Sequence, residues 1–385
     1  MNFVKVKIEG NFLDSFLYSG VLFTIDINGT LFTHSFKHLI NSFSETLKSS
    51  KEQTELKKFI LNPSQRSNIL DTNTPLEFII EQKFLRKHTI GTELNLGFWP
   101  TDLDIKNNMI YISSEKGVEI YPFYWRDDGS VLSFEKKKIL WNESKVFGVS
   151  TGSWGRTMIA AGTEGALELF NQYDSDFSEY LGEITIQPRS ISNGLWIDCE
   201  LNKYSTLLVL KGIDTQETLN FEKTISKTRL QEQLESKSLD EDEKSNLVNN
   251  LVSDLETCPT NLSLDNSKII QYWLNDHTNL IHGIDKDLNK YKFDSKAKKW
   301  IELYNTDSEK DHNYNPSSIA YIREGMLFES HDSLFYSKNE STNEIEENFI
   351  SWRTFPRSKN YINHVNIVTD DFLDIYAFSK LDLQD

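Results

Sequence analysis

The chain has 385 residues, of which 38% are apolar and 12% aromatic, and its formal net charge at pH 7 is −17. This length and apolar content suit one large repetitive domain or about two to three average domains, and they exclude a disordered chain. The negative charge argues against direct nucleic-acid binding, which depends on Lys and Arg side chains that neutralise phosphates.

The cysteines and the N-terminal segment indicate a compartment. Cys199 and Cys258 are the two cysteines, and neither belongs to a C-x-x-C motif, so the sequence predicts neither a disulfide framework nor a zinc ribbon. Lys5, Lys7 and Glu9 interrupt the apolar region that a signal peptide needs. No run approaches the roughly 18 apolar residues of a membrane span. We therefore expect a cytoplasmic protein without a membrane partner.

The first elements along the chain are a strand, a hairpin and a helical segment. The strand "FVKVKIEG" at 3–10 has no hairpin partner of its own. Residues 21–36 alternate apolar and polar side chains around the turn Asn28-Gly29, which predicts a β-hairpin. From residue 37 to residue 62 the apolar side chains recur at helical spacing, which predicts a helical insertion.

A second hairpin is predicted at 109–123, and it is followed by the motif G-x-S-x-G at 148–152. That motif is typical of the nucleophile elbow of serine hydrolases, where a strand leads through a tight turn at the Ser into a helix. After Ser150 the sequence instead runs through further glycines into the strand-like "TMIAAG". We therefore interpret Ser150 as a strand residue and expect no catalytic role for it.

The segment "GSWGRT" at 152–157 is the most unusual short stretch of the chain. Trp154 and Arg156 are residue types that dominate binding hot spots, and flanking glycines place them on a loop. They are interaction candidates. The alternative is that Trp154 packs over the edge of a sheet while Arg156 forms a salt bridge with a neighbour.

Residues 221–256 form a second predicted helical insertion, and a charged disordered loop is the alternative. Ser238 to Glu241 match the capping box S-x-x-E. Such an αα-hairpin can bury its apolar face against itself, the rest of the domain or a partner. We predict that it is a docking arm for a partner. Its interaction candidates are the leucines of the apolar face: Leu230, Leu234, Leu247, Leu251 and Leu255.

Hairpins recur along the whole chain. Beyond 21–36 and 109–123 they are predicted at 158–170, 195–210, 280–293, 326–338 and 366–378. Without the helical segments, their spacing is about 40 to 50 residues, which is the period of a propeller blade. The chain thus resembles β-propeller repeat proteins. The resemblance implies an all-β single domain over residues 1–385, with about seven blades, closed by the N-terminal strand. A β-sandwich or two smaller β domains are the alternatives.

The resemblance does not identify a function. The blades lack the WD dipeptide repeat and the kelch double glycine, so no family's functional residues carry over. We expect a non-enzymatic scaffold, or a regulatory subunit of a cytosolic multiprotein assembly, with protein partners. The alternatives are a channel-face enzyme, such as a hydrolase or lyase acting on a sugar or lactone, and a small-ligand sensor. The sequence predicts no catalytic residue, cofactor or metal ligand.

Overall fold

A computed structural model describes residues 3–61, 75–88, 93–126, 131–182, 184–236, 239–264, 268–275, 278–304, 314–322, 325–338 and 341–378. In these residues the strands form seven mainly antiparallel sheets, each of four or five strands. We number the sheets 1 to 7 in chain order from the sheet that begins at Phe12, so that the sheet combining the last described strands with the N-terminal strand is sheet 7.

Each sheet contains strands that follow one another in the chain, and sheet 7 is completed by two strands from the N-terminal region. Sheets 1 to 3 contain β2 (Phe12–Tyr18), β3 (Val21–Asp26), β4 (Thr30–Ser35) and β6 (Leu94–Asn95); β7 (Asp102–Lys106), β8 (Met109–Ser114), β9 (Gly117–Trp125), β10 (Val131–Phe134) and β11 (Lys138–Trp141); and β12 (Gly148–Thr151), β13 (Arg156–Ala160), β14 (Ala166–Phe170) and β15 (Arg189–Ser192). Sheets 4 and 5 contain β16 (Asp198–Leu201), β17 (Leu207–Lys211), β18 (Gln216–Asn220) and β19 (Thr260–Asn261); and β20 (Ile269–Asn275), β21 (Leu280–Asp285), β22 (Lys290–Asp294) and β23 (Lys299–Tyr304). Sheets 6 and 7 contain β24 (Ser318–Ile322), β25 (Gly325–Ser330), β26 (Ser333–Lys338) and β27 (Ser341–Glu347); and β28 (Ser351–Thr354), β29 (His364–Val368), β30 (Phe372–Phe378), β1 (Phe3–Glu9) and β5 (Leu76–Ile80).

Local turn chemistry explains how the hairpins form. Between β3 and β4, the Asp26 carboxylate accepts hydrogen bonds from the backbone N–H groups of Asn28 and Thr30, both at 2.9 Å. Gly29 has a φ of 72° in the same turn, a conformation that residues with a Cβ rarely adopt. An added Cβ would lie 2.6 Å from the carbonyl oxygen of Phe98. The glycine therefore permits both the turn and the close approach of the next segment.

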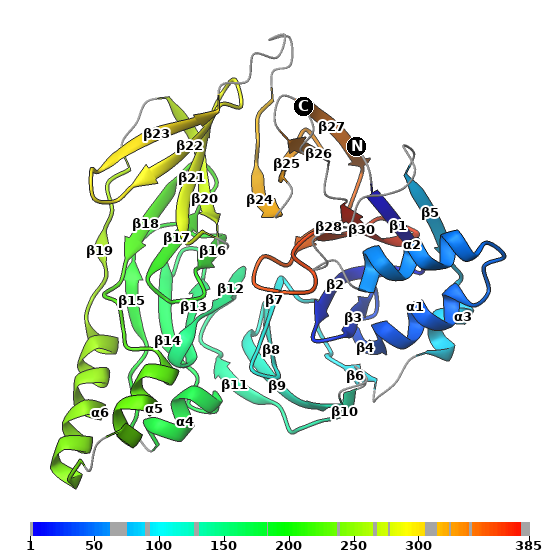
Figure 1. The fold of residues 1–385 in the computed structure, drawn as a ribbon. Helices are drawn as coiled ribbons and strands as arrows, with labels where there is room; N and C mark the ends of the chain where they lie inside the picture. The colour runs from blue at the N-terminus through cyan, green and yellow to red at the C-terminus, as the bar shows by residue number, and fades with distance from the viewer. Residues whose placement is uncertain are drawn as a thin grey trace.

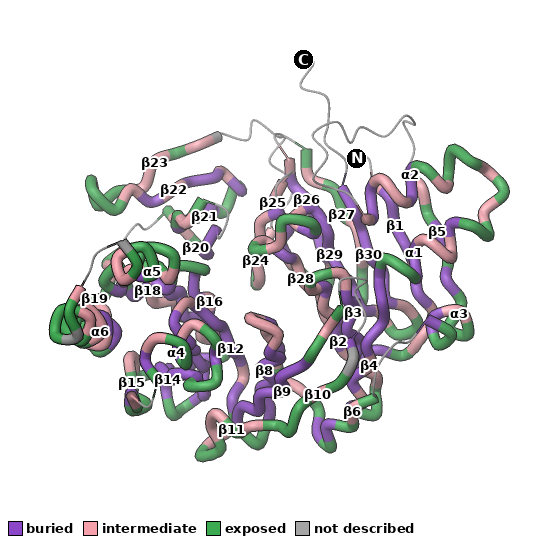
Figure 2. Tube along the Cα trace, turned by 60° about the horizontal axis from the view of Figure 1, so that its bottom comes forward, coloured by how far each residue is buried: buried purple, intermediate pink, exposed green. Residues whose placement is uncertain are grey.

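The sheets pack face to face in a ring around a common centre (Figure 1). Seven apolar clusters of the described residues fill the seven contacts between successive sheets, including the contact between sheet 7 and sheet 1. Buried positions accordingly run along the strands, whereas exposed positions lie mainly in turns and on the outer helices (Figure 2). Each sheet thus buries apolar side chains on both faces, which confirms the predicted β-propeller-like repeat.

The N-terminal strand lies within sheet 7, next to the last described strand of the chain. β1 pairs antiparallel with β30 from the pair Phe3–Phe378 to the pair Glu9–Phe372, and it pairs parallel with β5 on its other side. The Lys5 ammonium also lies 2.6 Å from the carboxylate of Asp374 on β30. The two ends of the described chain are therefore joined within one sheet.

Six α-helices are found in the described residues. α1 (Phe36–Ser44), α2 (Ser50–Leu61) and α3 (Gln82–Lys87) lie between β4 and β6, and Leu39 and Phe59 pack into the cluster between sheets 7 and 1. α4 (Ser175–Tyr180) lies between β14 and β15, whereas α5 (Lys227–Ser236) and α6 (Glu241–Glu256) lie between β18 and β19. None of the described helices is long and apolar enough to cross a membrane.

Five of the six described helices lie at one face of the ring, together with a set of turns. In each sheet the connection between strands one and two lies at the same end as the connection between strands three and four, because the strands are antiparallel. We call this end of the ring the insertion face. It carries α1, α2, α4, α5 and α6, the connections at 19–20, 107–108, 152–155 and 202–206, and the loop 355–363 between β28 and β29, whereas α3 follows β5 at the opposite end.

Removal of β1 tests its contribution to the ring. Deletion of residues 1–9 leaves the hydrogen-bonding groups of β30 unpaired and removes the partner of β5, and exposed strand edges promote association. We expect loss of the monodisperse protein or a melting temperature lower by at least about 10 °C, measured by size-exclusion chromatography and thermal denaturation. A deletion of residues 1 and 2 alone keeps β1 and serves as the control. Equal melting temperatures for both truncations would contradict this prediction.

Candidate functional site

The centre of the ring holds a cavity of about 600 Å³. We count the strands of each sheet from the innermost one, which in sheet 7 is β28. The first strand of every sheet contributes to the lining of the cavity. From sheet 1 to sheet 7, examples of these lining residues are Tyr18, Asp102, Ser150, Glu200, Leu274, Tyr321 and Arg353. This volume lies within the range of pockets that bind small ligands or side chains. The cavity is therefore the first candidate for a functional site.

Two aspartates of β7 face this cavity because alternate residues of a strand point to the same side. The Asp102 carboxylate accepts a hydrogen bond of 2.9 Å from the backbone N–H of Val149 on β12. The Asp104 carboxylate accepts one of 2.8 Å from the N–H of Thr151 on the same strand. Both carboxylates thus join the first strand of sheet 2 to the first strand of sheet 3.

Arg353 on β28 connects three sheets. Its guanidinium donates hydrogen bonds to the Asp14 carboxylate of sheet 1 at 2.6 and 2.8 Å. It also donates to the Asp102 carboxylate at 2.9 Å and to the backbone carbonyl of Leu103 at 3.0 Å, both in sheet 2. A guanidinium has five fixed donors and suits such a multidentate contact, which Lys could not reproduce.

The surroundings shift the pKa values of this ion pair. Burial raises the pKa of Asp102 to about 6, although the charge of Arg353 and the hydrogen bond from Val149 oppose the shift. Burial lowers the pKa of Arg353, but the carboxylates of Asp14 and Asp102 outweigh it, and the net shift is upward. Arg353 therefore stays charged at any pH at which the protein is folded.

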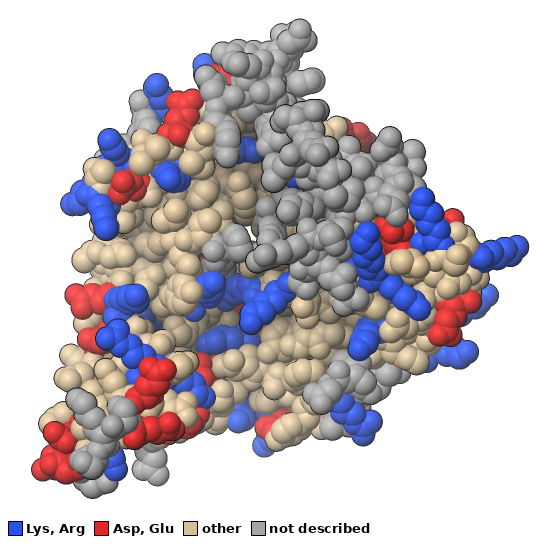
Figure 3. Space-filling view, in the orientation of Figure 1, with Lys and Arg blue, Asp and Glu red and all other residues tan. Residues whose placement is uncertain are grey.

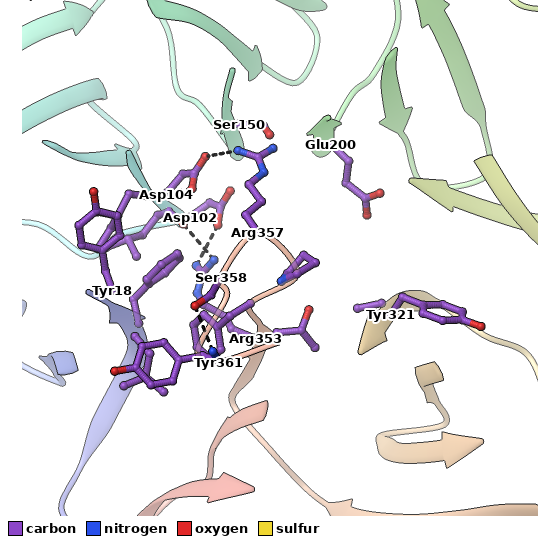
Figure 4. A pocket seen from close by; sticks show the side chains of 18 of the residues that line it. Tyr18, Asp102, Asp104, Ser150, Glu200, Tyr321, Arg353, Arg357, Ser358 and Tyr361 are labelled. Atoms are coloured by element: carbon purple, nitrogen blue, oxygen red, sulfur yellow. Dashed lines mark hydrogen bonds and ion pairs between the residues drawn. The ribbon is translucent and has the colours of Figure 1, made fainter. Parts of the chain in front are cut away.

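The loop 355–363 closes part of the cavity on the insertion face. Arg357 on this loop donates hydrogen bonds to the carbonyl oxygens of Thr151, at 2.6 Å, and Leu201. Its guanidinium lies 3.7 Å from the carboxylate of Asp104. Arg357 reaches from the loop toward Asp104 and Ser150, as Figure 4 shows. The loop is thereby fixed to the ends of β12 and β16.

The part of the cavity next to sheets 4 to 6 is lined by Glu200 and Tyr321, which lie away from Arg353 in this view (Figure 4). The Glu200 carboxylate forms an ion pair with Lys211 and accepts a hydrogen bond of 3.0 Å from the N–H of Leu274 on β20. Burial, the largest influence, raises the pKa of Glu200. Lys211 also lies 3.5 Å from the carboxylate of Asp198.

Ser150 lies on β12, where the sequence places a strand residue. Its hydroxyl accepts a hydrogen bond of 3.0 Å from the backbone N–H of Leu201 on β16. After a single 3₁₀ turn at Ser153–Gly155, the chain continues into β13, so no α-helix follows the serine. The hydroxyl thus joins sheet 3 to sheet 4, as Asp102 and Asp104 join sheet 2 to sheet 3.

Trp154 is buried rather than displayed on a loop. Its side chain is 1% exposed and packs in a cluster with residues of α4, α5 and α6. The indole N–H donates a hydrogen bond of 2.8 Å to the carbonyl of Ile225, just before α5. Its backbone has a φ of 59°, which is rare for a bulky residue and costs about 1–3 kcal/mol. This strained residue holds the second helical segment against sheet 3.

Arg156 is likewise buried, and it binds the end of α6. Its Nε lies 2.7 Å from a carboxylate oxygen of Glu168, which is fully buried and also forms an ion pair with Arg189. Both arginines donate to the carbonyl of Leu255, each at 3.2 Å. Cations stabilise the C-terminal end of a helix, where unpaired carbonyl groups carry partial negative charge. The guanidinium of Arg156 also lies over the ring of Phe221.

These positions correct the expectation that the interaction candidates form an exposed docking surface. Leu230, Leu251 and Leu255 are at most 1% exposed, and Leu234 and Leu247 are partly buried against the same cluster. The leucines of α5 and α6 pack together with Trp154 and with Phe177 of α4. In the segment "GSWGRT", the alternative to a displayed loop is therefore found: Trp154 is packed and Arg156 forms a salt bridge with Glu168.

Apart from Ser150, for which the sequence predicts no catalytic role, the residues that line the central cavity, or channel, were not singled out from the sequence. Two signals in the sequence are consistent with them: "DLDIK" at 102–106, where two acids alternate within a strand, and "WRTFPR" at 352–357, where two arginines follow an apolar run. Neither signal identifies its partner, because Arg353 and Asp102 are 251 positions apart.

Comparisons with known proteins find a likeness in structure but no match in sequence. No protein-family model matches the chain, and no curated protein matches it in sequence. Among solved structures it is similar to one described as YCF48 bound to D1 peptide, with a TM-score of 0.48 and 9% identity, over 100% of this chain and 96% of that chain. The strand pairing and the apolar clusters of this chain themselves define its ring of sheets.

The buried salt bridge at the end of α6 predicts a large effect of one substitution. Arg156→Met removes one of the two donors to the Leu255 carbonyl and leaves Glu168 with one of its two cations. Breaking a buried ion pair from one side costs about 3–5 kcal/mol, and we expect this loss in the free energy of unfolding measured with urea. Arg229→Met, an exposed position on α5, is the matched control and should change it by less than about 0.5 kcal/mol. Equal effects would show that Arg156 does not hold the helices.

The raised pKa of Asp102 predicts a pH dependence. In the folded protein this carboxyl keeps its proton up to about pH 6, whereas its ordinary pKa is 3.8. The folded state therefore binds the proton more tightly, and this contribution to stability is present below about pH 4 and lost as the pH rises through 6. The melting temperature of Asp102→Asn relative to the wild type should accordingly rise by a few degrees between pH 4 and pH 7. Asp371→Asn, in an exposed turn, is the control, and a pH-independent difference for Asp102→Asn would contradict the assignment.

Proposed function

We propose that the chain is a seven-bladed propeller with two helical insertions, and that it acts as a non-enzymatic protein-interaction module. The pairing of the acids in the cavity carries this proposal. Each of the four carboxylates in its described lining has a cation: Arg353 for Asp102, Arg357 for Asp104, and Lys211 for both Asp198 and Glu200.

This pairing favours a structural use of the channel over a catalytic one. A general acid or base must be able to reach the reacting group of a substrate. Asp102, Asp104 and Glu200 instead accept backbone hydrogen bonds from the next sheet. Their removal would disturb the contact between sheets. These carboxylates therefore support a rigid ring that presents its loops and insertions to a partner.

The charge distribution indicates the kind of partner. The chain carries a net charge of −17, yet Lys and Arg side chains gather near the centre of the ring, over the loop that follows β28 (Figure 3). Lys203 and Lys359 belong to connections of the insertion face. A local basic surface on an acidic protein favours a negatively charged partner and orients its approach. The partner that suits this surface is an acidic segment of another protein.

Co-purification from the native host tests the proposed function. A tagged full-length chain should co-purify with a stoichiometric protein partner. With the variant Lys203→Glu/Lys359→Glu, charge repulsion should reduce the amount of co-purified partner at least tenfold. The matched control is Lys116→Glu/Lys145→Glu, which makes the same change of net charge in connections at the opposite end of sheet 2.

The outcomes of this experiment are distinct. Loss of the partner with the first variant and its retention with the control support the proposal. Purification of the chain alone, or equal loss with both variants, contradicts it. A chain that purifies alone and hydrolyses or cleaves a sugar or lactone would favour the channel-face enzyme.

A further inference from the structure

A second cavity, of about 800 Å³, lies on the insertion face between α5 and the connections at 152–155 and 202–206. It is distinct from the central cavity, because the described linings of the two cavities share no residue. The charged residues of its described lining are Lys203, Lys223, Lys227, Arg229 and Asp254.

The described lining of this cavity carries more positive than negative charge. Four cationic side chains line it, and Asp254 is the one carboxylate in its described lining. Lys227 also forms ion pairs with two residues of α4: its ammonium lies 3.3 Å from the carboxylate of Asp176 and 2.6 Å from that of Glu179. Lys223 and Arg229 form no ion pair within the part of the chain that the structure describes. The cavity therefore has an excess of positive charge that a ligand can neutralise.

Hydrogen-bond donors accompany these charges. Hydroxyl groups of Ser153, Thr206, Thr224 and Ser226 belong to the same lining. Ser226 directly precedes α5, and its hydroxyl accepts a hydrogen bond of 3.3 Å from the N–H of Arg229. Hydroxyl, ammonium and guanidinium groups together are the donors that bind phosphate oxygens.

The cavity is also held in place by the ring. The hydrogen bond from the Trp154 indole to the carbonyl of Ile225 fixes the segment that leads into α5. The Ser153 hydroxyl lies 3.2 Å from that of Ser205 in the connection between β16 and β17. Both walls are thus attached to sheets 3 and 4. A preorganised site loses less entropy when it binds a ligand.

We propose that this cavity binds the phosphate group of a phosphorylated segment of the partner protein. The proposal rests on the proposed function, since it assumes that a polypeptide partner binds the insertion face. A phosphate monoester brings a charge of about −1.5 to −2 and three acceptor oxygens, whereas a carboxylate brings one charge and two oxygens. The excess of cations and hydroxyl groups here fits the phosphate better.

Short peptides test the site without the natural partner. The probes are a five-residue alanine peptide with a central phosphoserine, the same peptide with serine, and the same peptide with glutamate. Each is titrated into the full chain by calorimetry at fixed, low ionic strength. The phosphoserine peptide should bind at least tenfold more tightly than the serine peptide, and the glutamate peptide should lie between them.

A pair of variants assigns the binding to this cavity. Lys223→Ala/Arg229→Ala should weaken phosphoserine-peptide binding at least tenfold and leave the melting temperature nearly unchanged, because both side chains are exposed. Lys116→Ala/Lys145→Ala removes the same charge elsewhere and should not weaken it. Equal binding of the phosphoserine and serine peptides, or equal binding by the two variants, would overturn the proposal.

Treatment of the co-purified complex with phosphatase separates this inference from the proposed function. Release of the partner, together with the peptide result, supports both. A partner that stays bound after dephosphorylation, and that Lys223→Ala/Arg229→Ala also retains, overturns the phosphate site but leaves the interaction module intact. A chain without any protein partner contradicts the proposed function, while the peptide titration still reports on the cavity.

Discussion

Every sheet of this protein has two apolar faces, and the ring is the arrangement that covers both. An isolated sheet of four short strands would leave at least one face in water, and burial of apolar surface is the main stabilising contribution to folding. The seven clusters between successive sheets meet this need only if sheet 7 also packs on sheet 1. That contact depends on β1, whose Val4, Val6 and Ile8 are fully buried in it. The antiparallel pairing of β1 with β30 is therefore the constraint on which the rest of the fold depends.

At the centre of the ring, the polar residues that line the channel also connect neighbouring sheets. First strands of neighbouring sheets have no shared ladder of backbone hydrogen bonds, so side chains supply the connection. Asp102 and Asp104 join sheets 2 and 3, Ser150 joins sheets 3 and 4, and Glu200 joins sheets 4 and 5. Arg353 joins sheet 7 to sheets 1 and 2. A buried carboxylate without such partners would be strongly destabilising, which explains why these groups occur in satisfied sets.

The fold could be predicted from the sequence to the extent that local patterns determine it. Hairpin turns such as Asn28-Gly29 follow from backbone chemistry within a few residues, and the strand alternation marks which side chains are buried. In sheet 4 the predicted hairpin at 195–210 corresponds to its first and second strands rather than its second and third, because "LWIDCEL" alternates as well as the later strands do. The channel could not be predicted, since Arg353 meets Asp14 across 339 positions. The burial of Trp154, Arg156 and the leucines also depends on which surface the helices meet, and periodicity does not specify that surface.

The strain at Trp154 shows how the ring and the insertion depend on each other. A left-handed backbone at a tryptophan persists only if the surrounding contacts outweigh its cost. Here the contacts come from the helical segment itself. The carbonyl of Ile225 accepts a hydrogen bond from the indole N–H, and the leucines of α5 and α6 pack in the same cluster as the indole ring. The same carbonyl belongs to the segment that lines the basic cavity. The residue that fixes the insertion to sheet 3 therefore also sets the position of Lys223 and Ser226 relative to Ser153, so the geometry of the basic cavity follows from the packing of the ring.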